Sequence, residues 1–243
     1  MISFAFRDPR DGAPQPPAAG RDEMALATAV PALRRGDAAA ARTALAGRKR
    51  KAAVEAPALE LARAYLALAE GKREEAREAL AALTTAHPRW VAAVEAEADL
   101  AADEGRASDA LERYQALRRL VPSDERVRSR VEALRGVIGT AKRAEAEAAL
   151  EAGDLETARR AAHALLQLDP ASAGGLVLLS RVAAAGGKVE DAWTWAQEAR
   201  KKAPADRGVA AFAAEAAAKA GRWADAADLY EGLAAADTAF VPK

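Results

Sequence analysis

The stretch Gly153–Pro170, GDLETARRAAHALLQLDP, decides the fold of this chain. It opens on a glycine, carries alanine five residues later at Ala158 and leucine twelve later at Leu165, and closes on proline. Glycine ends a helix at a tight turn, and proline cannot continue one, so a single helix is expected between them. Ala158 and Leu165 are seven residues apart and therefore share a face of that helix. The stretch predicts the turn and second helix of a helical hairpin.

The same frame occurs six times. Its glycines, spaced by 35, 34, 48, 34 and 34 residues, are Gly36, Gly71, Gly105, Gly153, Gly187 and Gly221. Five residues after them stand Ala41, Ala76, Ala110, Ala158, Ala192 and Ala226. Four copies end seventeen residues on, at Pro88, Pro122, Pro170 and Pro204. One hairpin cannot bury its apolar face alone, so the copies are expected to stack.

The copies GKREEAREALAALTTAHP, GRASDALERYQALRRLVP, GDLETARRAAHALLQLDP and GRWADAADLYEGLA resemble the tetratricopeptide repeat family over roughly 22–237. The first helices keep a small middle residue at Ala64, Ala98, Ala146, Ser180 and Ala214. Their early aromatic is mostly missing, although Trp90 stands near its place. The resemblance implies an all-α fold: a right-handed α-solenoid of about six helix-turn-helix repeats, whose first helices line a groove for a peptide.

A longer segment interrupts the array between Pro122 and Gly153, which are 31 positions apart where the other proline-to-glycine steps are 17. We expect one long helix over Asp124–Ala152, about 43 Å long at 1.5 Å per residue, with Ser123 as its N-cap. A break at Gly136 or Gly139, which would give an extra helix, is the alternative. The apolar stripe along it is expected to be Val127, Val131, Leu134, Ile138, Ala141, Ala148 and Leu150.

The chain then divides into five parts. Residues 1–21 form a proline-rich arm, disordered or extended, in which Phe4 and Phe6 offer a short strand. A block of three repeats over 22–122, the connecting helix over 123–152 and a second block over 153–237 follow. Residues 238–243 are a tail. No sheet is expected elsewhere, because no alternating β-branched run appears.

Composition bounds the function. The sequence has 72 alanines, 27 arginines against 9 lysines, and no asparagine, as in proteins from GC-rich bacterial genomes. Net charge is zero, so no overall attraction to nucleic acid is expected, and cysteine is absent. No apolar run is long enough to span a membrane. Met1–Arg10 lacks the pattern of a signal peptide, which favours a cytoplasmic protein, or a periplasmic or envelope-associated one if the true start lies upstream.

No residue set indicates catalysis. The two histidines, His87 and His163, lie outside any metal-ligand spacing, and no glycine-rich phosphate loop is present. We therefore expect no enzyme activity, no cofactor and no metal. The basic cluster Arg48–Lys51 could contact phosphates or simply be a solvated helix end.

Two groups are candidates for binding a partner. Glu95, Asp99 and Asp103 stand four apart on one predicted first helix, either as an acidic strip in the groove, suited to a basic peptide, or as a solvated face. Trp193 and Trp195 point about 200° apart, so we expect that they cannot both be core and that one is either exposed, as an interface anchor, or covered by a neighbour. Trp223, two after Gly221, is expected to pack on its turn.

No polar capping helix is visible after Leu233, which leaves three options: a longer parent chain, a dimerising end, or Phe240–Val241 folding back as a lid. The leading functional hypothesis is a scaffold that binds a protein or peptide partner in its groove. The alternatives are a self-associating, homo-oligomeric component of a bacterial envelope or organelle assembly, and the non-catalytic arm of a larger enzyme.

Overall fold

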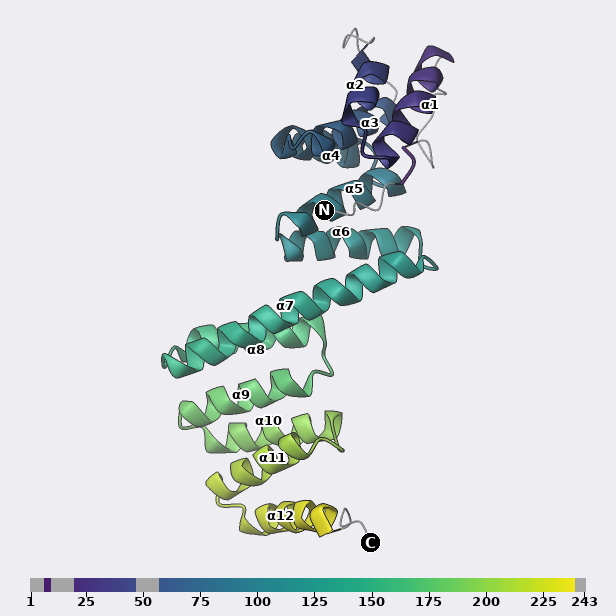
Figure 1. Ribbon diagram of the computed structural model, residues 1–243. Coiled ribbons are helices and arrows are strands. Elements are labelled where there is room, and N and C mark those ends of the chain that lie inside the picture. The colour runs from purple at the N-terminus through teal and green to yellow at the C-terminus, as the bar shows by residue number, and fades with distance from the viewer. Residues whose placement is uncertain (1–6, 10–19, 47–56, 239–243) are drawn as a thin grey trace. The chain divides into compact units, whose positions relative to one another are not determined.

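The computed structural model describes residues 7–9, 20–46 and 57–238, and this part of the chain holds twelve helices and no strand (Figure 1). Their bounds are α1 Gly20–Arg34, α2 Ala38–Ala46, α3 Pro57–Ala69, α4 Arg73–Ala86, α5 Val91–Asp103, α6 Ala107–Leu120, α7 Glu125–Glu151, α8 Leu155–Leu168, α9 Ala173–Ala185, α10 Val189–Lys202, α11 Arg207–Lys219 and α12 Trp223–Thr238. The strand at Phe4 and Phe6, the cluster Arg48–Lys51 and the lid at Phe240–Val241 lie outside the described residues.

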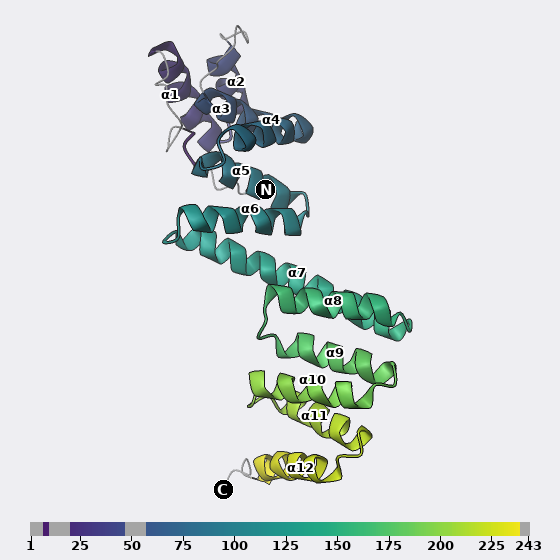
Figure 2. The same ribbon diagram turned by 180° about the vertical axis from the view of Figure 1, so that it is seen from behind.

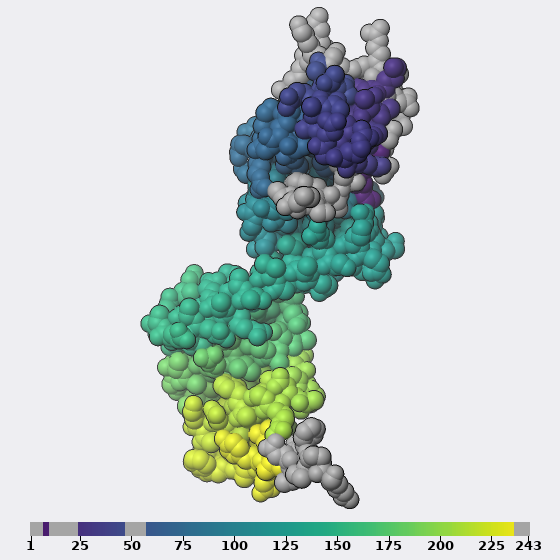
Figure 3. All heavy atoms as spheres, in the orientation of Figure 1, coloured from purple at the N-terminus to yellow at the C-terminus, as the bar shows by residue number. Residues whose placement is uncertain are grey.

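The chain forms two compact units, Met1–Arg135 and Gly136–Lys243. In unit 1 the hairpins α1–α2, α3–α4 and α5–α6 follow one another, and in unit 2 the hairpins α9–α10 and α11–α12 follow α8 (Figures 1 and 2). In the space-filling view, the atoms of α8 to α12 form one continuous mass on the face shown (Figure 3). The expected all-α helical-repeat solenoid is confirmed.

The six frame glycines make one kind of turn. Each has a positive φ, between 71° and 78°. The N–H of the residue after each glycine donates to the carbonyl of an alanine five residues earlier, as Asp154 does to Ala149 at 2.8 Å. This bond is the 6→1 bond that closes a helix on a left-handed residue. The glycine frame therefore sets where every first helix ends.

Small residues hold the two helices of each hairpin together. The frame alanines Ala41, Ala76, Ala110 and Ala158 have no exposed surface, and Ala192 and Ala226 are buried as well. The middle residues of the first helices are equally buried, and Ser180 donates from Oγ to the carbonyl of Ala192 at 2.6 Å. Helices packed on small side chains approach closely, so a larger residue at these positions would separate them.

The four prolines end the second helices in the same way. The N–H of the residue before each proline donates to the carbonyl of the residue that stands twelve positions after the frame glycine. Asp169, for example, donates to the carbonyl of Leu165 at 2.9 Å. Proline has no N–H and cannot extend this ladder. The next first helix begins three residues after the proline, as α9 does after Pro170.

Helix α7 is a lengthened first helix. It has 27 residues where α3, α5, α9 and α11 each have 13, and it runs through Gly136 and Gly139 without a break. It starts three residues after Pro122 and ends two before Gly153, at the usual places for a first helix. Fourteen additional residues make almost four full turns, so both halves can present a similar face.

Two details predicted for this segment are wrong. The side chain that accepts from the first backbone N–H groups of α7 belongs to Asp124 rather than Ser123, with 3.0 Å between its Oδ1 and the N of Arg126. Ala141 and Ala148 are exposed, whereas Ala146 and Ala149 are buried. The second half of α7 follows the register of the hairpin that it forms with α8, in which Ala146 is the small middle residue, and so departs from a uniform stripe.

Two glycine substitutions test the turn geometry with opposite expected signs. At Gly153 and Gly136 alike, an added Cβ meets no atom within 4 Å, so only the backbone decides the outcome. Gly153→Ala forces a left-handed residue at φ 76° and is expected to destabilise by about 1–2 kcal/mol. Gly136→Ala, inside α7, is expected to stabilise by about 0.5–1 kcal/mol. Urea unfolding measures both, and equal signs would contradict the turn assignment.

Candidate functional site

The acidic strip lies on α5 in unit 1. Glu95 is 2% exposed and Asp99 5% exposed, whereas Asp103, at the end of the helix, is exposed. Carboxylates are almost never buried without a partner. The three carboxylates therefore lie on one helix, but other parts of unit 1 cover two of them.

Arg7 covers Glu95. Its Nε lies 2.5 Å from Oε2 of Glu95, and its Nη2 lies 2.9 Å from Oδ2 of Asp124, which precedes α7. The guanidinium thus joins a carboxylate on α5 to one just before α7 and is only 19% exposed. The pKa of Arg7 is raised, because these two hydrogen-bonded carboxylates outweigh the burial of its charge.

Asp124 is held ionised by the same contact. Burial acts to raise the pKa of its carboxyl, but the hydrogen bond from Arg7 and the N–H of Arg126 outweigh burial and lower the pKa below its ordinary 3.8. The guanidinium of Arg126 adds a longer contact, 3.9 Å from Oε1 of Glu95. The sequence offered no signal for the Arg7 contacts, which join residues 88 and 117 positions apart.

Asp99 has a different environment. Its Oδ1 accepts a hydrogen bond from the hydroxyl of Tyr114 on α6, and Nη2 of Arg130 on α7 lies 3.9 Å away. Burial raises the pKa of Asp99 to about 6 in spite of the tyrosine bond and the arginine charge. The nearby carboxylates of Glu95 and Asp103 act in the same direction as burial.

This shift makes the stability of unit 1 depend on pH. The pKa of Asp99 is about 6 in the folded chain against an ordinary 3.8, so the folded chain binds this proton more tightly. The stability that this proton contributes to the folded chain is fully present below about pH 4 and is lost as pH rises through about 6. The free energy of unfolding falls by up to about 3 kcal/mol over this range. Asp99→Asn stays neutral and should gain stability relative to the parent by up to that amount between about pH 4 and pH 7. Urea unfolding at both pH values measures it, and a constant difference would contradict it.

The two candidate tryptophans both pack against neighbouring helices. Trp193 is 5% exposed and joins the cluster formed with α11 and α12. Trp195 is half-buried and packs against apolar residues of α8, α9 and α11. Trp195 is thus covered by neighbours rather than exposed, because α10 contacts both α9 and α11 and opposite faces of it are covered. Trp223 does not pack on its turn and is 71% exposed.

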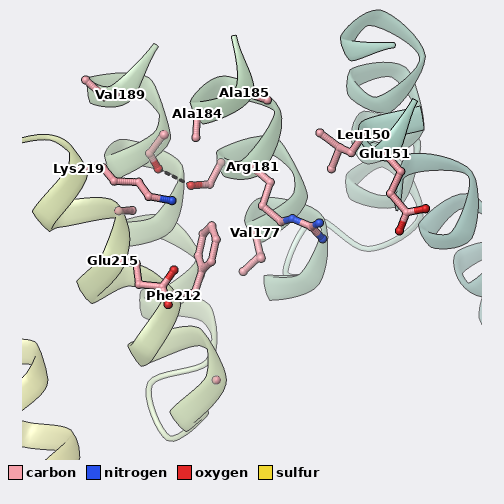
Figure 4. Close-up of a pocket in the computed structure, with 14 residues that line it drawn as sticks. Leu150, Glu151, Val177, Arg181, Ala184, Ala185, Val189, Phe212, Glu215 and Lys219 are labelled. Atoms are coloured by element: carbon pink, nitrogen blue, oxygen red, sulfur yellow. Dashed lines mark hydrogen bonds between the residues drawn. The ribbon is translucent and has the colours of Figure 1, made fainter. Parts of the chain in front are cut away.

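Unit 2 carries a groove that the sequence did not indicate. It has a volume of about 1020 Å³ and is lined by α9, α11, the first turn of α10 and the end of α7 (Figure 4). The aromatic ring of Phe212 and the side chain of Val177 form its apolar floor, and both are half-buried. Leu150 lies on the α7 side, and Trp193 belongs to the cluster against which Phe212 packs.

Charged side chains surround this floor. Three charged residues are exposed: Arg181 on α9, and Glu215 and Lys219 on α11. Their side chains lie around Phe212 and Val177 in Figure 4. Within the described part of unit 2, no ion pair engages any of these three. Ser180 supplies a lining hydroxyl, which donates to the carbonyl of Ala192.

The remaining candidates are isolated. His87 packs edge-on against Trp90, with ring centroids 6.3 Å apart, and His163 is exposed. The described residues contain no group of three or more His, Cys, Asp or Glu side chains placed to hold a metal ion. Among the described helices, none combines the length and apolar character needed to cross a bilayer.

The repeated turn is the observation that classifies the chain. Six positive-φ glycines, each followed by a buried alanine five residues on, join a first and a second helix in the same way. The described helices are therefore repeated helix-turn-helix hairpins of one kind. No protein-family model and no curated protein matches the sequence of this chain.

Solved structures of tetratricopeptide repeat proteins are similar to this chain. One, from Parabacteroides merdae, is 16% identical, with 88% of this chain and 79% of that chain covered and a TM-score of 0.36. The TPR domain of P58(IPK) is 19% identical, with 87% and 60% covered and a TM-score of 0.43. The TPR2AB domain of yeast Sti1, in a complex with pHSP90, is 14% identical, with 91% and 92% covered and a TM-score of 0.39.

Proposed function

We propose that this protein is an interaction scaffold that binds an extended segment of a partner protein along the first helices of unit 2. The observation that carries the proposal is the groove on α9 and α11, which combines an apolar floor with unpaired charges at its edge. Its volume of about 1020 Å³ reaches the upper end of ligand sites, about 300–1,000 Å³, and holds several side chains.

The chemistry of the groove favours a particular kind of segment. Phe212 and Val177 offer a surface for one apolar side chain, which gains free energy by leaving water. Arg181 and Lys219 lie at the edge without an ion-pair partner in the described part of unit 2, and a guanidinium binds a carboxylate through two parallel hydrogen bonds. We therefore expect an apolar residue followed or preceded by an acidic one.

The residues expected to bind a partner keep different parts in this proposal. Trp193 is assigned a supporting role beneath Phe212, and the half-buried Trp195 offers only part of its surface. On α5, Asp103 is accessible, whereas Glu95 and Asp99 would meet a basic partner only if Arg7 moved away.

The proposed function needs no catalysis. A hydrolase requires a nucleophile beside a base, and the lining of the groove places none together. Its only hydroxyl belongs to Ser180, which is buried and already donates to a backbone carbonyl.

Partner capture with matched variants tests the proposal. The bait is the full chain in four forms: parent, Phe212→Ala, Arg181→Glu, and the control Arg159→Glu, which reverses an exposed charge on α8 outside the groove. A partner of the groove should be captured by parent and control and lose roughly tenfold with each groove variant, about 1.4 kcal/mol. Equal capture by all four forms would contradict the proposal.

A second function, self-association through α12, is favoured by two exposed aromatic residues. Trp223 is 71% exposed and Tyr230 47% exposed, and they stand seven residues apart on one face of the helix. Tyr230 occupies the frame position that Tyr114 fills in the core of unit 1. Light scattering against concentration tests it: an oligomer that Trp223→Ser and Tyr230→Ser abolish would support it, and a strict monomer at high concentration would contradict it.

A further inference from the structure

The residues Arg7–Pro9, here called the strap, are seated on the acidic side of unit 1. Asp8 and Pro9 are buried, although they belong to a segment without helical structure. Asp8 lies 3.6 Å from Nη2 of Arg34 on α1, while Arg7 reaches α5 and the start of α7. The strap thus contacts residues at the end of α1, on α5 and just before α7, all in unit 1.

The contacts of Arg7 resemble those of a bound ligand. Glu95 on α5 and Asp124, just before α7, accept from different nitrogens of one guanidinium, at 2.5 and 2.9 Å. A planar guanidinium presents donors in a fixed fork, which an ammonium group cannot reproduce. The buried hydroxyl of Tyr65 on α3 also lies close to the backbone of Arg7.

Glu95 depends on this cation. Its side chain is only 3% exposed, and Arg126 comes no closer than 3.9 Å to Glu95, although it lies 3.4 Å from Asp124. A buried carboxylate that loses its hydrogen-bonded cation pays its full desolvation cost. A guanidinium at the same place can replace Arg7 and contact both Glu95 and Asp124.

We propose that the acidic site formed by Glu95 and Asp124 binds an arginine-bearing extended segment of a partner protein, and that the strap fills this site in the free chain. The strap is a short anchor of three residues, held by the side chains of Arg7 and Asp8 and by the burial of Pro9. The Asp8–Arg34 contact is long, and Arg34 is 54% exposed, so it adds little. The partner binds by exchanging its arginine for Arg7.

Tethering makes the strap a strong competitor. A segment of the same chain acts at an effective concentration on the order of millimolar, so a free peptide meets a site that is mostly closed. The apparent affinity of the partner falls by the fraction of open sites. The inference goes beyond the unit 2 groove, since Phe212→Ala and Arg181→Glu alter that groove and leave unit 1 unchanged.

Titration with a fluorescent peptide of residues 3–10, SFAFRDPR, tests the proposal on the full chain. Arg7→Ala should bind this peptide at least about tenfold more tightly than the parent, because the strap no longer competes. The control peptide SFAFADPR should not bind. The double variant Arg7→Ala with Glu95→Gln should be nearly as stable as the parent but should not bind the peptide, because the carboxylate that the peptide's arginine would contact is gone. Circular dichroism establishes that each variant is folded.

Four results would overturn the proposal: a folded Arg7→Ala chain that binds neither peptide, equal binding by parent and variant, equal binding of both peptides, or a concentration-dependent dimer of the parent that Arg7→Ala abolishes. The last result would show that the strap of a second copy occupies the acidic site. If Arg7→Ala does not fold, Arg7→Lys keeps a cation beside Glu95 but loses the fork. The peptide should then bind Arg7→Lys more tightly than the parent, and no gain would count against the proposal.

Discussion

Replacement of Ala158 by arginine is expected to lower the free energy of unfolding by at least about 3 kcal/mol. Ala158 has no exposed surface and packs with Ala149 and Val182, at the contact between α7, α8 and α9. The long side chain must either force these helices apart or leave its charge without a partner. Urea unfolding and the melting temperature measure the effect.

Ala148→Arg is the matched control, because Ala148 is an exposed alanine on α7 in the same unit. Arginine is a good helix former, so the control should change stability by no more than about 0.5 kcal/mol. A melting temperature of Ala158→Arg equal to that of the control would show that the frame alanine does not face a helix contact.

Replacement of Arg7 by alanine is expected to destabilise the chain by about 3 kcal/mol, although Arg7 lies outside every helix. The loss comes from Glu95, whose carboxylate stays buried without its hydrogen-bonded cation. Glu95→Gln removes that charge and should recover most of the loss in the double variant. Urea unfolding of the parent, both single variants and the double variant gives the coupling energy.

The exposed pair of Arg159 with Glu156, at 3.2 Å, is the control for this cycle. Such pairs within one helix contribute about 0.3–0.5 kcal/mol. A coupling energy between Arg7 and Glu95 no larger than that between Arg159 and Glu156 would contradict a strap anchored at the acidic site.

The repeat was predictable because its signals are local. A glycine with a positive φ, an alanine five residues later and a proline at the end each act within one hairpin, so Gly153 and Ala158 could be placed from the sequence alone. The acidic spacing on α5 could also be read, because four residues make about one turn. What covers Glu95 could not, since Arg7 is 88 positions away in a segment without periodicity.

Opposite faces of one helix were harder to interpret. Trp193 and Trp195 do point apart, but α10 contacts both α9 and α11, so each face finds an apolar neighbour. The error at Ala141 and Ala148 has the same origin, since α7 belongs to a hairpin whose register decides its buried face. The groove at Phe212 combines side chains from several helices, so no pattern within one helix could predict it.

The most direct test of the central claim is a nitrogen–proton NMR spectrum of the arginine side chains in the parent chain, with Arg7 assigned through Arg7→Lys. If Arg7 fills the acidic site, its Nε–H donates a hydrogen bond to Glu95 and is shielded from water. Its resonance should then exchange with solvent far more slowly than that of the exposed Arg159 and should move in Glu95→Gln. Exchange as fast as that of Arg159, with no response to Glu95→Gln, would contradict the account.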